Sequence, residues 1–177
     1  MDARDNTDPA SGKNRTTAER KSACEFVVTR SFNAPARIVF EAWIRPELLT
    51  QWWAPKSFGV SFLSCETDAR TGGTYRFVFS HPASEQPMAF FGRYIDVTPH
   101  ARLAWTNDEG HEGGTVTTVT FEDSGDETLL VMHDRYPSQE ALDDAIASGS
   151  TCGFGETFAQ LDELLVTLST RVLFGEP

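Results

Sequence analysis

One long amphipathic pattern near the end of the chain places the strongest constraint on its fold. Five large apolar residues recur there at steps of four, three, four and three, as on one face of an α-helix: Phe154, Phe158, Leu161, Leu165 and Leu168. A helix with a single apolar stripe must bury that stripe against a partner. We therefore expect the preceding part of the chain to supply a surface that covers this helix.

That surface is predicted to be a sheet, because residues 58–134 have the pattern of strands joined by short turns. TYRFVFS (74–80) alternates, and TVTTVTFED (115–123) is rich in β-branched residues. Gly92, within another strand segment, indicates a bulge or close packing. With a first strand at 24–32, about six or seven antiparallel strands are expected.

The order of the elements indicates an α+β fold. Residues 33–55 have the pattern of two short helices after the first strand, and 137–149 that of a third before the long helix. An antiparallel sheet has one face that needs cover, which the C-terminal helix supplies. If the sheet curves around that helix, the space between them can become a pocket.

A single folded domain is expected over 23–170. Residues 1–22 are polar and without periodicity, which predicts a flexible leader, and 171–177 are expected to form a C-terminal tail. The length of 177 residues suits one domain with a sizeable core.

The charge of the chain argues against two classes of partner. The formal net charge is −11, and residues 1–22 hold five basic and four acidic side chains, so the remainder carries −12. Nucleic acids and anionic lipids bind basic surfaces. Neither is expected as a partner, and the plainest role of the charge is solubility.

Cysteine and hydropathy patterns predict a cytoplasmic protein. The three cysteines form no CxxC pair, the N-terminus has no signal-like apolar segment, and no stretch approaches the ~18 apolar residues of a membrane span. The four histidines lack metal-binding spacing, and phosphate-binding and nucleophile-elbow motifs are absent. We therefore expect no metal, no cofactor and no membrane insertion, and the catalytic residues, if any, stay unknown.

Aromatic residues and one histidine are candidates for a binding site. Tyr75, Phe77 and Phe79 share one face of a strand, where they either form core or line a cavity. His133 shares a strand face with Leu129 and is buried if that face is. It is then a ligand donor or proton carrier, and otherwise a solvent-facing or simply hydrogen-bonded residue.

Two adjacent tryptophans end the second short helix. Trp52 follows Leu48 and Leu49 at helical spacing and is expected to pin this helix to the body of the protein. Trp53, close to Pro55, is expected to lie nearer to the pocket mouth, although the two roles can be exchanged.

Several blocks of sequence carry a resemblance to a known family: FNAPARIVFEAWIRPELLTQWWAP, RTGGTYRF, FGRYIDVTPHARLAWT, GTVTTVTFED, ETLLVMH and PSQEALDDAIASGSTCGFGETFAQLDELL. Over residues 24–168 the chain resembles the heat-shock protein 90 ATPase activator-like branch of the START superfamily. This superfamily is also called helix-grip, SRPBCC, or polyketide cyclase and lipid-transport-like. The resemblance implies a curved seven-stranded antiparallel sheet around the C-terminal helix, with two short helices closing one end. It also implies an elongated hydrophobic cavity between sheet and helix.

One position departs from this family. Its members often carry Gly-Trp at the start of the last helix, where this chain has Gly153 and Phe154. The aromatic ring is kept, but an indole N–H that could contact a ligand is lost.

The leading hypothesis is that the cavity binds a small hydrophobic or aromatic molecule, for carriage, sequestration or sensing. The predicted wall residues are Trp53, Phe58, Tyr75, Phe77, Phe79, Phe91, Tyr94, Trp105, Met132, His133, Phe154 and Phe158.

Two alternatives use the same fold differently. An enzyme of cyclase, dehydratase or hydrolase type would draw its acid, base or oxyanion donors from His133, Tyr75, Tyr94 and Arg93. A protein-interaction domain would contact a chaperone, as the co-chaperone of this branch does, or a second copy of itself in a homodimer.

Overall fold

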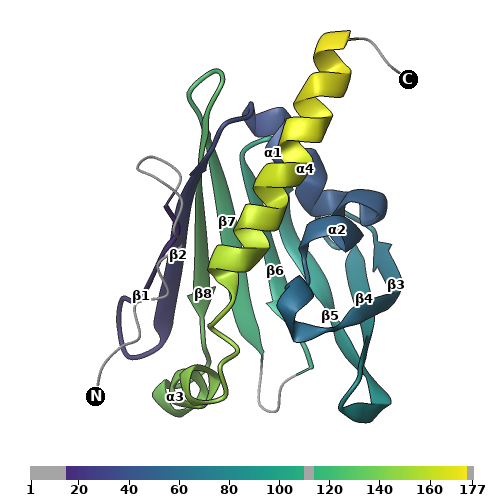
Figure 1. Ribbon diagram of the computed structural model, residues 1–177. Coiled ribbons are helices and arrows are strands. Elements are labelled where there is room, and N and C mark those ends of the chain that lie inside the picture. Colours follow the sequence, from purple (N-terminus) through teal and green to yellow (C-terminus); the bar gives the residue numbers. More distant parts are fainter. Residues whose placement is uncertain (1–14, 110–113, 175–177) are drawn as a thin grey trace.

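One twisted antiparallel sheet lies against the long C-terminal helix (Figure 1). The computed structural model describes residues 15–109 and 114–174. Within them the sheet has eight strands, in the spatial order β1-β2-β8-β7-β6-β5-β4-β3. The strands are β1 (Thr17–Arg20), β2 (Glu25–Phe32), β3 (Ser61–Thr67), β4 (Thr74–His81), β5 (Ser84–Thr98), β6 (Arg102–Asn107), β7 (Thr115–Asp123) and β8 (Thr128–Arg135).

The helices gather on one face of the sheet and at its two ends. Between β2 and β3 the chain forms α1 (Ala36–Ile44), α2 (Pro46–Trp52) and the short 3-10 helix η2 (Lys56–Phe58). After β8 come α3 (Gln139–Ala147) and α4 (Phe154–Phe174). Figure 1 shows α1 and α2 at one end of the sheet and α3 at the other, near the start of α4. The predicted α+β fold is confirmed.

The strand count is corrected from seven to eight by β1, an edge strand that the sequence did not predict. Its residues pair antiparallel with β2, from Thr17 opposite Thr29 to Arg20 opposite Phe26. The segment is mostly exposed and has no apolar alternation. Because backbone hydrogen bonds to β2 form it, hydropathy carries no sign of it. The strand falls within the predicted leader, 1–22, of which 1–14 lie outside the described residues.

Helix α4 buries the predicted stripe against the rest of the protein. Phe158, Leu161 and Leu165 are buried, while Phe154 and Leu168 are half-buried. The helix runs to Phe174, so it continues into the segment expected to be a tail, of which 175–177 lie outside the described residues. In the part of the chain that the structure describes, no helix combines the length and the apolar character needed to cross a membrane.

A buried ion pair attaches α4 to β2. The guanidinium of Arg30, on the inner face of β2, pairs with the carboxylate of Asp162 on α4. Arg30 also donates to Oγ1 of Thr16 at 2.9 Å, and its guanidinium carbon lies 5.5 Å from the centre of the Phe32 ring. The charge is thus paired where it is buried, as a buried guanidinium requires.

A buried amide attaches α4 to the segment that follows α2. Gln160 donates from Nε2 to the carbonyl oxygens of Trp52 at 3.0 Å and Ala54 at 2.9 Å. Its Oε1 accepts from the backbone N–H of Lys56 at 2.9 Å. One side chain of α4 therefore satisfies three backbone groups between the last residue of α2 and the first residue of η2, where helix ends leave carbonyls and N–H groups without partners.

Gly92 of β5 leaves room for the side chain of Tyr75 to reach from β4 to β6. It lies on β5 opposite Tyr75 of β4, and a Cβ at Gly92 would lie 1.9 Å from the carbonyl oxygen of Thr106 on β6. The Tyr75 hydroxyl donates to that same carbonyl at 2.8 Å. The phenol thus passes over β5 at the glycine, and the predicted close packing at Gly92 is confirmed.

We expect Gly92→Ala to lower the free energy of unfolding by more than about 2 kcal/mol, because the new methyl group would collide with a backbone carbonyl. Gly72→Ala is the control, since Gly72 has a φ of 87° but no atom within 4 Å of an added Cβ. It should cost only about 1 kcal/mol. Urea denaturation measures both changes, and equal losses would contradict the steric account.

Candidate functional site

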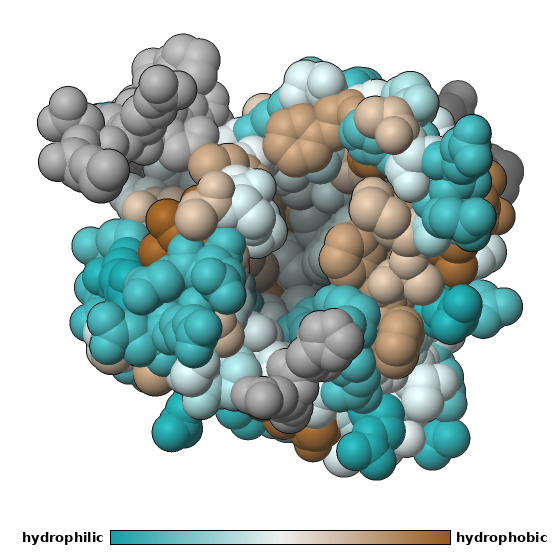
Figure 2. All heavy atoms as spheres, turned by 90° about the horizontal axis from the view of Figure 1, so that it is seen from below, coloured by the Kyte–Doolittle hydropathy of each residue, from teal (hydrophilic) through white to brown (hydrophobic). Residues whose placement is uncertain are grey.

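A cavity of about 390 Å³ lies between the inner face of the sheet and α4. Side chains of α1 and α2 close one end, and the other end opens near α3, as the hollow in Figure 2 shows. Nearly half of the residues that line it are aromatic, namely Trp43, Trp52, Trp53, Phe58, Tyr75, Phe77, Phe79, Phe90, Tyr94, Trp105, Phe154 and Phe158.

The structure brings ten of the twelve sequence-predicted binding residues around this one cavity. They are Trp53, Phe58, Tyr75, Phe77, Phe79, Tyr94, Trp105, Met132, Phe154 and Phe158. The inner face of β4 supplies three of them, because alternate residues of a strand share a face. That these residues bind a ligand stays a prediction.

His133 does not line the cavity, and the idea that its strand face is the inner one is wrong. The inner face of β8 carries Leu130, Met132 and Asp134. His133 lies on the outer face, with its Nε2 3.0 Å from Oε1 of Glu25. Both faces of β8 carry apolar residues, and the outer one is itself half-buried. The alternation of side chains along β8 therefore assigned its residues to two faces, but it did not indicate which face is inside.

Phe91 is the second predicted wall residue that lies elsewhere. It is 37% exposed on the outer face of β5, with the guanidinium carbon of Arg76 5.9 Å from the centre of its ring. Its neighbour Phe90 lines the cavity instead. In two adjacent phenylalanines the sequence gives no sign of which one points inward. The register decides, because Phe90 pairs with the inward-facing Phe77.

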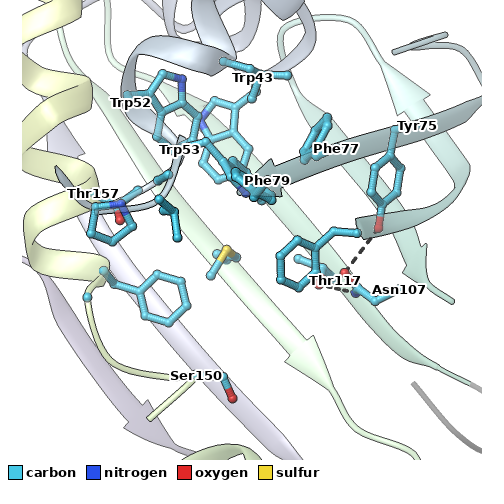
Figure 3. Close-up of a pocket in the computed structure, with 18 of the residues that line it drawn as sticks. Trp43, Trp52, Trp53, Tyr75, Phe77, Phe79, Asn107, Thr117, Ser150 and Thr157 are labelled. Atoms are coloured by element: carbon cyan, nitrogen blue, oxygen red, sulfur yellow. Dashed lines mark hydrogen bonds between the residues drawn. The ribbon is translucent and has the colours of Figure 1, made fainter. Parts of the chain in front are cut away.

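The two adjacent tryptophans differ in role. Trp52 is 1% exposed, and its indole N–H donates to the carbonyl of Ala42 at 2.9 Å, which fastens α2 to α1. Its predicted anchoring role is confirmed. Trp53 is half-buried and meets the Phe77 ring edge to face, with centres 5.4 Å apart. Both indoles line the cavity (Figure 3), so the anchor is also part of the wall.

The turn into α4 shapes the cavity mouth. Gly153 has a φ of 92°, and a Cβ there would lie 3.3 Å from the Phe58 ring. The next ring, Phe154, lies 6.4 Å from Phe26 and 6.2 Å from Phe158, measured between centres. Phe154 therefore contributes an apolar surface to the wall and no hydrogen-bond donor.

A chain of hydrogen bonds that the sequence did not predict crosses this apolar wall. The Tyr75 hydroxyl lies 3.3 Å from Oδ1 of Asn107, whose Nδ2 donates to Oγ1 of Thr117 at 3.0 Å. Thr117 in turn donates to Oδ1 of Asp134 at 2.6 Å. Figure 3 shows Tyr75, Asn107 and Thr117 side by side. Only the register of the paired strands reveals this series of hydrogen bonds, because it places Thr117 of β7 opposite Asp134 of β8.

Asp134 is the acidic residue at the end of this series of hydrogen bonds. Asp134 is only 9% exposed. Burial raises the pKa of its carboxyl group from 3.8 to about 6, although the hydrogen bond from Thr117 and the nearby His133 each lower it. The pKa of Glu109, the other acid of the wall, is also raised by burial. No lysine, arginine or histidine of the described residues lines the cavity. The ionisable part of the wall is therefore acidic.

The four candidates for acid–base chemistry do not converge. His133 and Arg93 do not line the cavity. Tyr75 and Tyr94 do, with ring centres 5.7 Å apart, and burial raises the pKa of both phenols. Both are therefore protonated at neutral pH and can donate hydrogen bonds. Among the described residues, no three His, Cys, Asp or Glu side chains are grouped as metal ligands.

An antiparallel sheet that holds a long C-terminal helix, with a cavity between them, defines a helix-grip protein of the START or SRPBCC superfamily. The chain belongs to the family described as Activator of Hsp90 ATPase homolog 1-like protein, whose sequence model matches residues 33–166. The resemblance inferred from the sequence is confirmed. No protein among those with curated descriptions matches the chain.

Solved structures share this fold over most of its length. A protein of Rhodobacter sphaeroides is 25% identical with a TM-score of 0.77, and the match covers 86% of this chain and 99% of that one. A protein of Chromobacterium violaceum is 30% identical with a TM-score of 0.65, over 80% and 96%. An AHSA1-like protein from Aeromonas hydrophila, 15% identical with a TM-score of 0.62 over 78% and 93%, shares the fold alone.

The raised pKa of Asp134 has a measurable cost in stability. Because its pKa is about 6 in the folded protein and near 3.8 when unfolded, the folded state holds the proton more tightly, and ionisation at pH 7 destabilises it by up to about 3 kcal/mol. We expect Asp134→Asn to raise the free energy of unfolding at about pH 7 by about 1–3 kcal/mol. The gain should shrink as the pH falls from about 6 to about 4.

Chemical denaturation of the two proteins across this pH range measures the difference. Glu122→Gln, which neutralises an exposed carboxylate of β7, is the control and should change the stability by less than about 0.5 kcal/mol. A less stable Asp134→Asn protein at neutral pH would contradict the prediction.

Proposed function

We propose that the protein binds a small, mostly apolar or aromatic molecule in the cavity between the sheet and α4. The observation that carries the proposal is the cavity itself, which is open at one end and walled largely by aromatic and other apolar side chains. Its volume of about 390 Å³ lies in the usual range of ligand pockets. Carriage, sequestration and sensing of a ligand all begin with this binding step.

The exposed apolar side chains at the open end support ligand access. Phe58, Met88 and Phe90 are between 40% and 48% exposed, and all three line the cavity. Large exposed apolar side chains mark either a protein contact or a ligand site. The family name refers to an activator of the Hsp90 ATPase, but these three residues border the mouth of a cavity. Their exposure is therefore accounted for by the ligand site.

Burial of apolar surface supplies the affinity. A two-ring aromatic molecule with about 250 Å² of apolar surface gains roughly 6 kcal/mol when it leaves water. Part of this gain offsets the loss of translational and rotational freedom. The net gain is therefore below about 6 kcal/mol, and we expect a dissociation constant between about 50 μM and 1 mM for so small a probe.

Two adjacent phenylalanines test the site with a matched pair of variants. We expect Phe90→Ala to weaken binding of naphthalen-2-ylmethanol about 5- to 30-fold, because it removes about 1–2 kcal/mol of wall contacts. Phe91→Ala should leave binding unchanged, since Phe91 has nearly the same exposure, 37% against 40%, but lies on the outer face. Isothermal titration calorimetry measures both; equal losses, or no binding by the wild-type protein, would overturn the proposal.

A second variant fills the cavity from within. Met132 lies on the inner face of β8 and lines the cavity. Met132→Trp should abolish binding of the same probe, because the larger side chain occupies ligand space. Circular dichroism and a cooperative unfolding transition show that the variant is folded, and a folded variant that binds as wild type does would place the probe elsewhere.

A further inference from the structure

We propose that the ligand is a cationic amphiphile, an apolar or aromatic molecule with one ammonium group, and that Asp134 is the counter-ion of that group. This inference rests on the proposed function and names the chemical class of the ligand. It follows from three features of the cavity: an incompletely bonded buried carboxylate, an all-acidic set of charges, and a row of aromatic residues that starts two strands away.

The carboxylate of Asp134 lacks a cationic partner within the described residues. Oδ1 accepts from Thr117 at 2.6 Å, whereas Oδ2 accepts no hydrogen bond from the described part of the chain and is not sealed off by neighbouring atoms. The residue is 9% exposed and lines the cavity. Buried carboxylates are normally paired with a charge or fully hydrogen-bonded. A ligand ammonium group would supply the missing donor and the missing charge together.

The sign of the charges around the cavity selects among ligands. The only residues of the wall that carry a formal charge when ionised near neutral pH are Asp134 and Glu109, within the described residues. The chain as a whole has a net charge of −11. An anionic ligand would meet repulsion from both carboxylates and from the overall field, whereas a cation is attracted by both.

The register places aromatic rings where the apolar part of such a ligand would lie. Across the inner face, Asp134 pairs with Thr117, Thr117 with Trp105, and Trp105 with Tyr94. All four residues line the cavity. Since neighbouring strands are ~4.8 Å apart, Trp105 is about 10 Å from Asp134. A molecule with its ammonium group at Asp134 therefore extends over Thr117 onto two aromatic rings, which also attract cations.

The protonation of Asp134 makes this binding depend on pH. With the cavity empty, its pKa of about 6 leaves the carboxylate mostly ionised above pH 7 and mostly neutral near pH 5. The titratable or charged groups around it are Glu109, Tyr75, Tyr94 and Cys152 in the cavity wall, Glu25 on β2, and His133, Arg135 and Tyr136 along its own stretch of chain. These groups are common to the wild type and to Asp134→Asn, so their titration cancels when the two are compared.

The experiment compares three probes with one skeleton: naphthalen-2-ylmethylamine as the cation, naphthalen-2-ylmethanol as the neutral form and 2-naphthoate as the anion. By calorimetry at about pH 7.5 and low salt, we expect the amine to bind at least about 10-fold more tightly than the alcohol, and the naphthoate most weakly. In Asp134→Asn the amine should fall to the affinity of the alcohol, while the alcohol changes less than about 3-fold. The preference of the wild type for the amine should also fall about 10-fold between about pH 7.5 and about pH 5.

Glu109→Gln is the matched control for the counter-ion, because it neutralises the other acid of the wall. Because Glu109 is exposed and its Oε2 already accepts from the backbone N–H of Phe91 at 3.3 Å, its attraction for the ammonium group is the weaker one, and the variant should retain most of the preference for the amine. Loss of the preference in Glu109→Gln but not in Asp134→Asn would overturn the assignment to Asp134. If the alcohol binds and the amine binds no more tightly, the cationic ligand class is wrong while the cavity function stands. If none of the three probes binds, the proposed function fails as well.

Discussion

The amide of Gln160 is the contact on which the placement of α4 beside the cavity depends. It fixes α4 to the segment after α2 through three hydrogen bonds to backbone groups, and the buried pair of Arg30 with Asp162 fixes the same helix to β2. Two polar attachments to different elements thus fix the position of α4 against the sheet. Apolar side chains alone would favour closure of the gap, because interiors pack to high density. Gln160 lies two residues after Phe158, which lines the cavity, so this attachment positions one wall of it.

The two ends of the cavity differ because different kinds of residues form them. At the closed end Trp43 lies within about 6.3 Å, between ring centres, of five other aromatic rings. Through this cluster, α1 and α2 pack against the sheet and α4. At the open end the wall includes exposed residues and the glycine before α4. One end of the cavity is therefore closed by packed aromatic rings, whereas the wall at the other end includes exposed side chains.

The parts of this fold that could be predicted are those in which buried apolar residues recur at the regular spacing of a helix or a strand. The stripe on α4 and the alternation of Tyr75, Phe77 and Phe79 both identified inward-facing residues. Strand β1 was missed because backbone pairing holds it, and hydropathy carries no record of such pairing. His133 and Phe91 were misplaced for another reason: alternation defines two faces, and only the register of neighbouring strands tells which face is inside.

The same ambiguity concealed the most informative polar residue of the site. Asp134 is next to His133, so once the wrong face of β8 is taken as the inner one, the aspartate is assigned to solvent. Its true position is costly, because burial raises its pKa and its ionised form opposes folding at neutral pH. A neutral acceptor at this place would keep the Thr117 hydrogen bond without the buried charge. The proposed role as a counter-ion would account for a carboxylate at this position, where it accepts a hydrogen bond from Thr117 and lines the cavity.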